Sequence, residues 1–363
     1  LEDAPIALAA FARPEVKERH SQALSRLTQQ EIRLPKLDAR AAECLLQAVL
    51  DGEGIPPEVL EQLVAVADGN ALFLEELARA VPANASTAWF TKAPRTVLTL
   101  LEERCAAQPP AERRLLRAAS VLGVTFARDI LEVLVQCSEN AMPVDTTLHA
   151  LVRAELVAEG ERGRYRFRHP LVREAAYALL PEEDRMAAHA RVLAIGAARK
   201  DTSAAELAEH ARQARLAEET VVWSFRAAEE SFAANDMVTS VGFVRRALEA
   251  DPSSEVRGAV LALGSIASFF AGDLPNAHAW GIEAMRLAPR DSPWWIRCAG
   301  NMSAILSHVD PARRTKSILD EGYRALLKHE PGPDEWESFC ESLAITLNCE
   351  AGFDGELTAQ LTD

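Results

Sequence analysis

Apolar residues recur at intervals of three and four along most of this chain, and that spacing predicts a predominantly helical protein. The first such stretch follows Asp38, a residue suited to cap a helix, and Asp51-Gly52-Glu53-Gly54 ends it. Pro56-Pro57 opens a second helix, and Asp68-Gly69-Asn70 separates it from a third that ends near Val81. Further helices are expected over residues 95–106, 111–122, 128–135 and 145–157.

Strand-like patterns occur in three places. Ile6–Phe11 is a short continuous apolar run, typical of a buried strand, and Glu31–Leu34 alternates between polar and apolar residues. Two such strands with a helical connection suit part of an α/β sheet. The third place is Arg164–Arg168, where aromatic residues alternate with arginines after a hairpin predicted at Glu161-Arg162-Gly163.

The residues after this third strand place a histidine at the start of a helix. Pro170 suits the first helical position, where no backbone donor is needed, and apolar residues follow it at helical spacing. His169 is therefore expected beside the N–H groups of a helix start, which favour an anion. Two interpretations remain open: the ring caps the helix or bonds a nearby carbonyl, or it contacts a phosphate.

Beyond Pro181 the chain is expected to be helical to its end, with an internal repeat. Three positions recur 37 residues further on: Asn235-Asp236 as Gly272-Asp273, Ala247 as Ala284, and Pro252 as Pro289. Each unit reads as helix, short turn, helix and proline, and stacked units of this kind form an α-solenoid. The Ala and Pro positions resemble the tetratricopeptide family, although the unit is longer, and Ser224 and Ser231 stand at its usual Trp and Tyr positions.

Composition limits the class of protein. The chain has 363 residues, 48% of them hydrophobic and 26% charged, which predicts a soluble protein of two to four domains. No run of 18 apolar residues occurs, so no membrane span is expected. Six scattered cysteines without a C-x-x-C motif favour free thiols in a reducing, cytoplasmic compartment. Because the chain begins at Leu1, we expect a fragment of a longer protein.

Charge argues against nucleic acid as a partner. The net charge is −15, and residues 91–181 hold 13 Lys and Arg against 11 Asp and Glu. Binding to DNA relies on many phosphate contacts, so the four arginines of the predicted hairpin are better interpreted as a solvated strand face or a partner surface. Trp294 and Trp295 occupy adjacent helical positions that cannot both face one core, so one of them is expected to be partly exposed and open to a partner.

Three segments resemble the STAND class of signalling NTPases. Ala9–Glu15 is similar to the end of an NTPase strand, where the class has an arginine that senses the γ-phosphate, here Arg13; the alternative is a surface arginine. Ala67–Leu77 resembles the segment at which the class places a proline on adenine, but Ala71 replaces that proline. The alternative for Gly69 and Asn70 in this segment is a helix start without a ligand.

The third segment, Phe167–Tyr177, resembles the motif that closes the winged-helix domain of that class, in which the histidine, here His169, senses the nucleotide phosphates. The resemblance implies four parts of a mainly α fold, the first of them a remnant of an α/β NTPase sheet, the last tetratricopeptide-like. Their ranges are 1–36 for the NTPase remnant, 37–90 for a small helical domain, 91–181 for the winged helix and 182–363 for the helical repeats.

The resemblance also implies a function. ADP would hold the NTPase core and the winged helix closed, ATP would release them, and a protein or small-molecule effector on the repeats would bias that switch. The order of these parts resembles that of large bacterial serine/threonine kinases that carry an ATPase module. ATP or ADP with Mg would be bound by the intact parent, which could self-associate on activation. The sequence has no G-x-x-x-x-G-K-[ST] loop and no kinase motifs, so this chain alone is expected to bind no cofactor and to catalyse no reaction.

Two other functions fit the same residues. Helical repeats can serve as a protein-binding scaffold in which no nucleotide takes part. The winged helix could instead belong to a transcriptional regulator of the same class, which would bind DNA in a salt-dependent manner.

Overall fold

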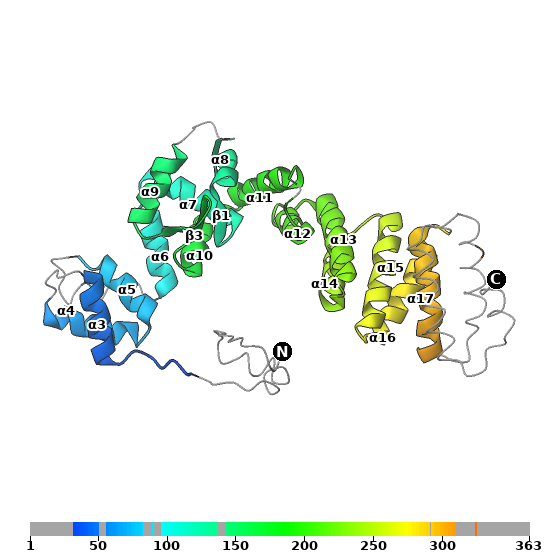
Figure 1. Ribbon diagram of the computed structural model, residues 1–363, viewed down its shortest axis with the longest axis horizontal. Helices are drawn as coiled ribbons and strands as arrows, with labels where there is room; N and C mark the ends of the chain where they lie inside the picture. The colour runs from blue at the N-terminus through cyan, green and yellow to red at the C-terminus, as the bar shows by residue number, and fades with distance from the viewer. Residues whose placement is uncertain are drawn as a thin grey trace. The chain divides into compact units, whose positions relative to one another are not determined.

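The computed structural model is mainly helical, with one small antiparallel sheet (Figure 1). The chain divides into two compact units, residues 1–100 and 101–363. Among the residues that the structure describes, no helix combines the length and the apolar character that crossing a membrane requires. The described residues are 32–50, 56–82, 89, 96–136, 143–199, 201–290, 292–309 and 324.

The first unit contains three helices that pack on one another, α3 (Ala39–Leu50), α4 (Pro57–Ala67) and α5 (Ala71–Ala80). A carboxylate oxygen of Asp38 accepts a hydrogen bond from the backbone N–H of Ala41 at 2.7 Å, so the predicted cap of the first helix is confirmed. The apolar stripe of each helix faces a shared core. Fully buried leucines come from all three helices: Leu46, Leu63 and Leu77.

The strand predicted over residues 31–34 is wrong for the residues that the structure describes. Residues 32–37 carry no regular secondary structure, and the side chains of Ile32 and Leu34 are 76% and 82% exposed. Alternation alone does not make a strand, because a strand also needs a neighbouring backbone to take its hydrogen bonds. The other predicted strand, Ile6–Phe11, lies outside the described residues, as does most of the expected NTPase remnant.

The boundary between the units falls within α6 (Val97–Ala106), and three more helices follow it: α7 (Pro110–Leu122), α8 (Arg128–Gln136) and α9 (Val144–Arg153). Three short strands accompany these helices: β1 (Thr125–Ala127), β2 (Val157–Glu159) and β3 (Arg164–Phe167). They form an antiparallel sheet in the order β1-β3-β2, with Phe126 opposite Tyr165 and Val157 opposite Phe167.

The sheet confirms one sequence prediction and corrects another. The hairpin and the alternation in β3 are as expected, since Tyr165 and Phe167 are buried whereas Arg164 and Arg166 are exposed. The helix predicted over 145–157 ends earlier, at Arg153, because Glu155 adopts a left-handed backbone (φ 55°) that turns the chain into β2. The sequence did not predict β1, which has only three residues and shows too little alternation to be recognised.

The rest of the described chain is helical, and from α11 onward each helix packs against the next (Figure 1). The helices are α10 (Pro170–Ala178), α11 (Glu182–Ala197), α12 (Ala204–Gln213), α13 (Ala217–Ala233), α14 (Met237–Glu249), α15 (Ser254–Phe270), α16 (Leu274–Leu287) and α17 (Pro293–Val309).

The two turns at equivalent positions of the sequence repeat have the same backbone geometry. Asn235 and Gly272 both have positive φ, 61° and 81°, the left-handed conformation that ends a helix. The carboxylate of the next residue then caps the following helix. Asp236 accepts from the backbone N–H of Thr239 at 3.1 Å, and Asp273 accepts from that of Asn276 at 3.3 Å.

The helices of each pair are also joined at matching points. The Ser240 hydroxyl of α14 donates to the carbonyl oxygen of Ala228 in α13 at 2.9 Å. In the second pair the Ser265 hydroxyl of α15 donates to the carbonyl oxygen of Ala277 in α16 at 2.7 Å. Ala228 and Ser265 are equivalent in the 37-residue repeat, and so are Ser240 and Ala277. Both pairs therefore have a hydroxyl-to-carbonyl hydrogen bond between equivalent positions. The serine lies on the second helix of the first pair and on the first helix of the second pair.

Candidate functional site

Of the four residues for which a nucleotide contact is predicted, Arg13 lies outside the described residues. Gly69 and Asn70 lie in the first unit and His169 lies in the second. Each is considered in its own surroundings.

Gly69 and Asn70 form the turn between α4 and α5. Gly69 has a φ of +72°, and a Cβ atom there would lie 2.6 Å from the Cβ of Lys36. Its carbonyl accepts from the backbone N–H of Leu37 at 3.0 Å, which ties the turn to the segment before α3. The Asn70 side chain accepts from the backbone N–H of Phe73 at 3.1 Å and caps α5. Both residues therefore have a structural role in this unit.

His169 sits at the start of α10, immediately after β3. The Nδ1 atom accepts a hydrogen bond from the backbone N–H of Leu171 at 3.1 Å, so the imidazole caps the helix. An accepting Nδ1 carries no proton, which places the proton of the neutral ring on Nε2. None of the described residues pairs with Nε2. The half-buried ring can therefore cap α10 and still offer an N–H group to a ligand.

The backbone on both sides of His169 is held firmly. The backbone N–H of Phe167 donates to the carbonyl of Val124 at 2.9 Å, and that of Arg168 donates to the carbonyl of Leu156 at 3.0 Å. One turn further along α10, the Arg173 guanidinium donates to the carbonyl of Ser120 in α7 at 2.8 Å. These bonds fix the helix start on the sheet and on α7.

A second cluster of polar side chains links α10, α11 and α12, and the sequence analysis did not predict it. The Tyr177 hydroxyl lies 2.9 Å from Nε2 of His189, and Nδ1 of His189 lies 2.8 Å from Nδ1 of His210. His189 is only 3% exposed, and burial together with the nearby His210 lowers its pKa to about 4. Burial also lowers the pKa of His210. The three residues belong to three helices, so no short motif reveals them.

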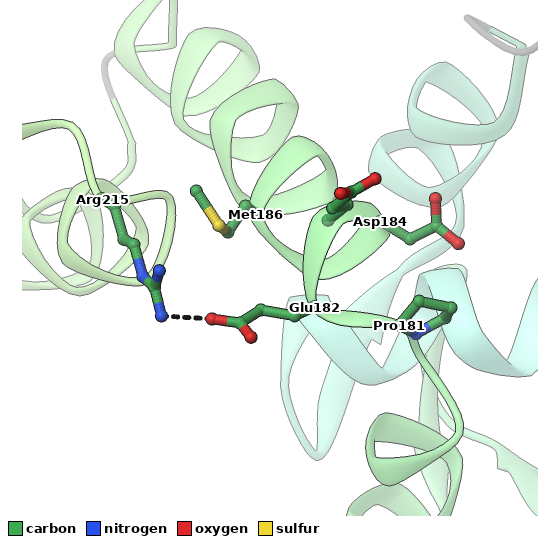
Figure 2. A pocket seen from close by; sticks show the side chains of 6 residues that line it. Pro181, Glu182, Asp184, Met186 and Arg215 are labelled. Carbon is green, nitrogen blue, oxygen red and sulfur yellow. Dashed lines mark hydrogen bonds and ion pairs between the residues drawn. The ribbon is translucent and has the colours of Figure 1, made fainter.

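A shallow depression lies at the start of α11 (Figure 2). Figure 2 shows the Arg215 guanidinium paired with the Glu182 carboxylate, and the side chain of Met186 lies beside them. Acidic side chains in the first turn of a helix stabilise it through the helix dipole. Since these carboxylates are exposed, we interpret the depression as the start of α11 and its ion pair with Arg215, which follows α12. The residues that line it are Pro181, Glu182, Glu183, Asp184, Met186 and Arg215.

A smaller cleft of about 280 Å³ lies between the sheet and α11. Its lining includes the apolar side chains of Phe126 and Val192 and also His210. At its rim Arg199 donates to Asp129 and to Asp201, both at 3.0 Å, and these bonds lower the pKa of each carboxyl group. The charges at the rim are therefore largely paired within the chain.

The two adjacent tryptophans of α17 have different surroundings. Trp295 is buried, and its indole N–H donates to the carbonyl of Met285 at 3.2 Å. Trp294 is half-buried, its ring centroid lies 5.4 Å from that of Phe225, and the Arg297 guanidinium lies over it. One of the pair is partly exposed, as their adjacency predicts, and Trp294 is the one that a partner could reach.

The described residues hold no group of three or more His, Cys, Asp or Glu side chains that could bind a metal ion. Two of the cysteines, Cys105 and Cys298, are buried and form no disulfide, and burial raises the pKa of Cys298 to about 12. No protein-family model, no curated protein and no solved structure matches this chain.

Proposed function

We propose that this chain is the regulatory part of a nucleotide-switched signalling protein of the STAND class, in which His169 contacts the phosphates of bound ADP. One observation carries the proposal. His169 caps α10 through Nδ1, which leaves its Nε2–H as a donor at a helix start, where backbone N–H groups also favour an anion. That combination suits a phosphate sensor.

The fold around His169 is compatible with the proposal. Helices followed by a small antiparallel sheet, with the histidine directly after the last strand, suit a winged-helix domain over residues 91–181. The helix pairs after α11, with their matched turns, suit a tetratricopeptide-like solenoid from residue 182. In this proposal 1–36 is the end of the NTPase core, and 37–90 is the small helical domain.

The other predicted nucleotide-binding residues have different roles in this proposal. Arg13 would sense the γ-phosphate from the NTPase core. Gly69 and Asn70 would contribute through the position of α5, because the Asn70 side chain already caps that helix. ATP or ADP with Mg would be bound by the intact parent, where a serine/threonine kinase domain is the expected output, and an effector on the repeats would set the switch.

A pair of variants in the intact parent distinguishes a phosphate contact of His169 from its role as a helix cap. His169→Ala removes both the cap and the N–H donor, whereas His169→Asn keeps a good helix cap and removes the imidazole. If His169 contacts phosphate, both variants should weaken ADP binding about tenfold or more, measured by calorimetry, because a charge-assisted hydrogen bond is lost. Wild-type ADP affinity in His169→Asn would reduce His169 to a structural cap.

The proposal also makes a simple prediction about the gene. Reading the coding DNA upstream of Leu1 should reveal a phosphate-binding loop of the form G-x-x-x-x-G-K-[ST] about one NTPase domain away. A start codon close to Leu1 with no such loop would contradict the nucleotide switch.

A protein-binding scaffold is the second candidate, and exposed apolar side chains on the helix pairs favour it. Val222 of α13, Val238 of α14 and Ile282 of α16 are 60%, 77% and 47% exposed. This function predicts that partner affinity is the same with ADP, with ATP and without nucleotide in the intact parent. A change in affinity with nucleotide would favour the switch.

A further inference from the structure

We propose that Tyr177, His189 and His210 form an acid-sensitive latch that holds α10, α11 and α12 together and opens when the two imidazoles become protonated. The latch goes beyond the proposed function, because it acts between helices of the second unit and requires no nucleotide. It links α10, the helix that His169 caps, to α12.

The geometry of the two imidazoles sets the chemistry. Two Nδ1 atoms that lie 2.8 Å apart can share only one proton, since one must donate and the other must accept. On the other side of His189, Nε2 and the Tyr177 hydroxyl lie 2.9 Å apart. A hydroxyl can donate or accept, so Tyr177 completes the chain of hydrogen bonds with either tautomer of His189. Both ring nitrogens of neutral His189 are thus hydrogen-bonded although the residue is almost completely buried.

Protonation of the imidazoles disrupts this chain of hydrogen bonds. A first extra proton keeps one donor and one acceptor between the rings, but it places a positive charge in a buried site. A second extra proton puts an N–H group on both facing Nδ1 atoms, which then repel each other. The contact between His189 and His210 cannot persist in that state, so α12 loses its polar link to α11.

The charged groups around the pair mostly oppose protonation. From α10 and α11, the guanidinium groups of Arg173 and Arg185 lie 5.0 Å and 4.9 Å from the centroid of the Tyr177 ring, and both disfavour a cation on His189. Glu209 of α12 acts in the opposite direction, but its carboxylate already pairs with Arg212 at 2.6 Å and with Arg246 at 3.3 Å.

The cleft beside the sheet brings further charges toward His210. This cleft is lined by His210, by Glu206 from the first turn of α12, and by Arg199 and Asp201 from the segment between α11 and α12. Arg199 and Asp201 neutralise each other at 3.0 Å. Glu206 is exposed to solvent, which screens its charge. None of these groups gives the buried pair a close counterion.

The direction of the pH effect follows from the lowered pKa values. The pKa of His189 falls from 6.5 to about 4 in the folded chain. Unfolded or opened chains therefore bind protons first, so the stability that the latch adds is complete above pH 6.5 and is lost as the pH falls toward 4. The pKa values of Asp129 and Asp201 are lowered from 3.8, so these two carboxylates titrate below that window, and the pKa of Glu209 is also lowered.

Hydrogen exchange on the whole chain tests the latch. Between pH 7 and pH 5, the protection of α12 amides, corrected for the intrinsic rate, should fall about tenfold, while that of α14 should change little. In the double variant His189→Gln, His210→Gln, which can still form hydrogen bonds but cannot gain charge, this fall should disappear. His149→Gln, at an exposed position on α9, serves as the matched control and should behave like the wild type.

Either of two results would overturn the latch: unchanged α12 protection in the wild type at pH 5, or the same loss of protection in the double variant. Because the double variant could pack poorly, ¹⁵N-histidine spectra of the unaltered chain give a second test. They should show His189 titrating well below pH 6.5, with ring nitrogens that share a proton at neutral pH. A His189 that titrates near pH 6.5 would contradict the proposal.

Discussion

Residues 101–180 and residues 204–309 are both largely helical, but their buried contacts are of different kinds. In the first region the core consists of large side chains such as Leu115, Leu131 and Phe167, which fill the space between helices and sheet. In the second region small residues let neighbouring helices approach closely. The fully buried alanines there include Ala228, Ala247, Ala277 and Ala284.

The difference indicates which kind of change each region should tolerate. A core of large side chains is damaged by a loss of volume, because a cavity remains. A helix pair whose backbones nearly touch is damaged by added volume, because no rotamer change can make room. Helix content alone does not distinguish the two regions.

The largest effect is expected from removing a central side chain of the first region. Phe167 is 1% exposed and its ring centroid lies 5.5 Å from that of Phe126, so Phe167→Ala should lower the free energy of unfolding by about 3–5 kcal/mol. Urea denaturation followed by circular dichroism measures this change. Arg166→Ala, on the exposed face of the same strand, should shift it by less than about 0.5 kcal/mol. Equal effects in the two variants would show that β3 does not anchor the core.

The converse test adds one methyl group to the second region. A Cβ atom on Gly258 would lie 2.6 Å from the backbone nitrogen of Ala288, which cannot move as a side chain can. Gly258→Ala should therefore destabilise the chain by about 1–3 kcal/mol. A Cβ atom on Gly242 of α14 would meet no neighbouring group within 4 Å, so Gly242→Ala should stabilise the chain by about 0.5–1 kcal/mol. Stabilisation by both substitutions would mean that the close approach of the helices is unimportant.

The smallest effects should come from the two repeated helix caps. Asp236→Ala and Asp273→Ala each remove one capping hydrogen bond at equivalent turns and should lower the melting temperature by about 2–4 °C, by nearly the same amount. Asp236→Asn and Asp273→Asn keep an accepting oxygen and should change it little. Calorimetric scans of the four variants would sharpen the comparison, and clearly unequal losses would argue against equivalent repeats.

Local sequence signals predicted most of the helices well. Asp38, Pro56-Pro57 and Asn70 each mark a helix start through the geometry of one turn, and the structure has a helix at each of them. The alternation in β3 was equally clear, because it lies next to a hairpin. The strand expected over residues 31–34 and the undetected β1 show the limit of such signals. Whether a short segment becomes a strand depends on a partner strand that is distant in the sequence.

The candidate site also combines features that local sequence predicts with features that depend on the fold. The position of His169 at a helix start follows from Pro170, which suits only the first turn. Its Nδ1 cap, and the Nε2–H group that the cap leaves over, depend on the rotamer that the fold imposes. For Gly69 and Asn70 the sequence allowed a ligand contact or a turn, and the contacts with Lys36 and Phe73 assign a structural role to both.

The sequence by itself determined the helical class of this protein, the position of His169 and the 37-residue repeat, because these depend on neighbours along the chain. Only the tertiary structure decided that His189 and His210 face each other, since they lie on different helices and no spacing rule connects them. It also decided that Trp295 is buried while Trp294 remains half-exposed. Backbone preferences are local, whereas burial and hydrogen-bond partners depend on which distant segments pack together.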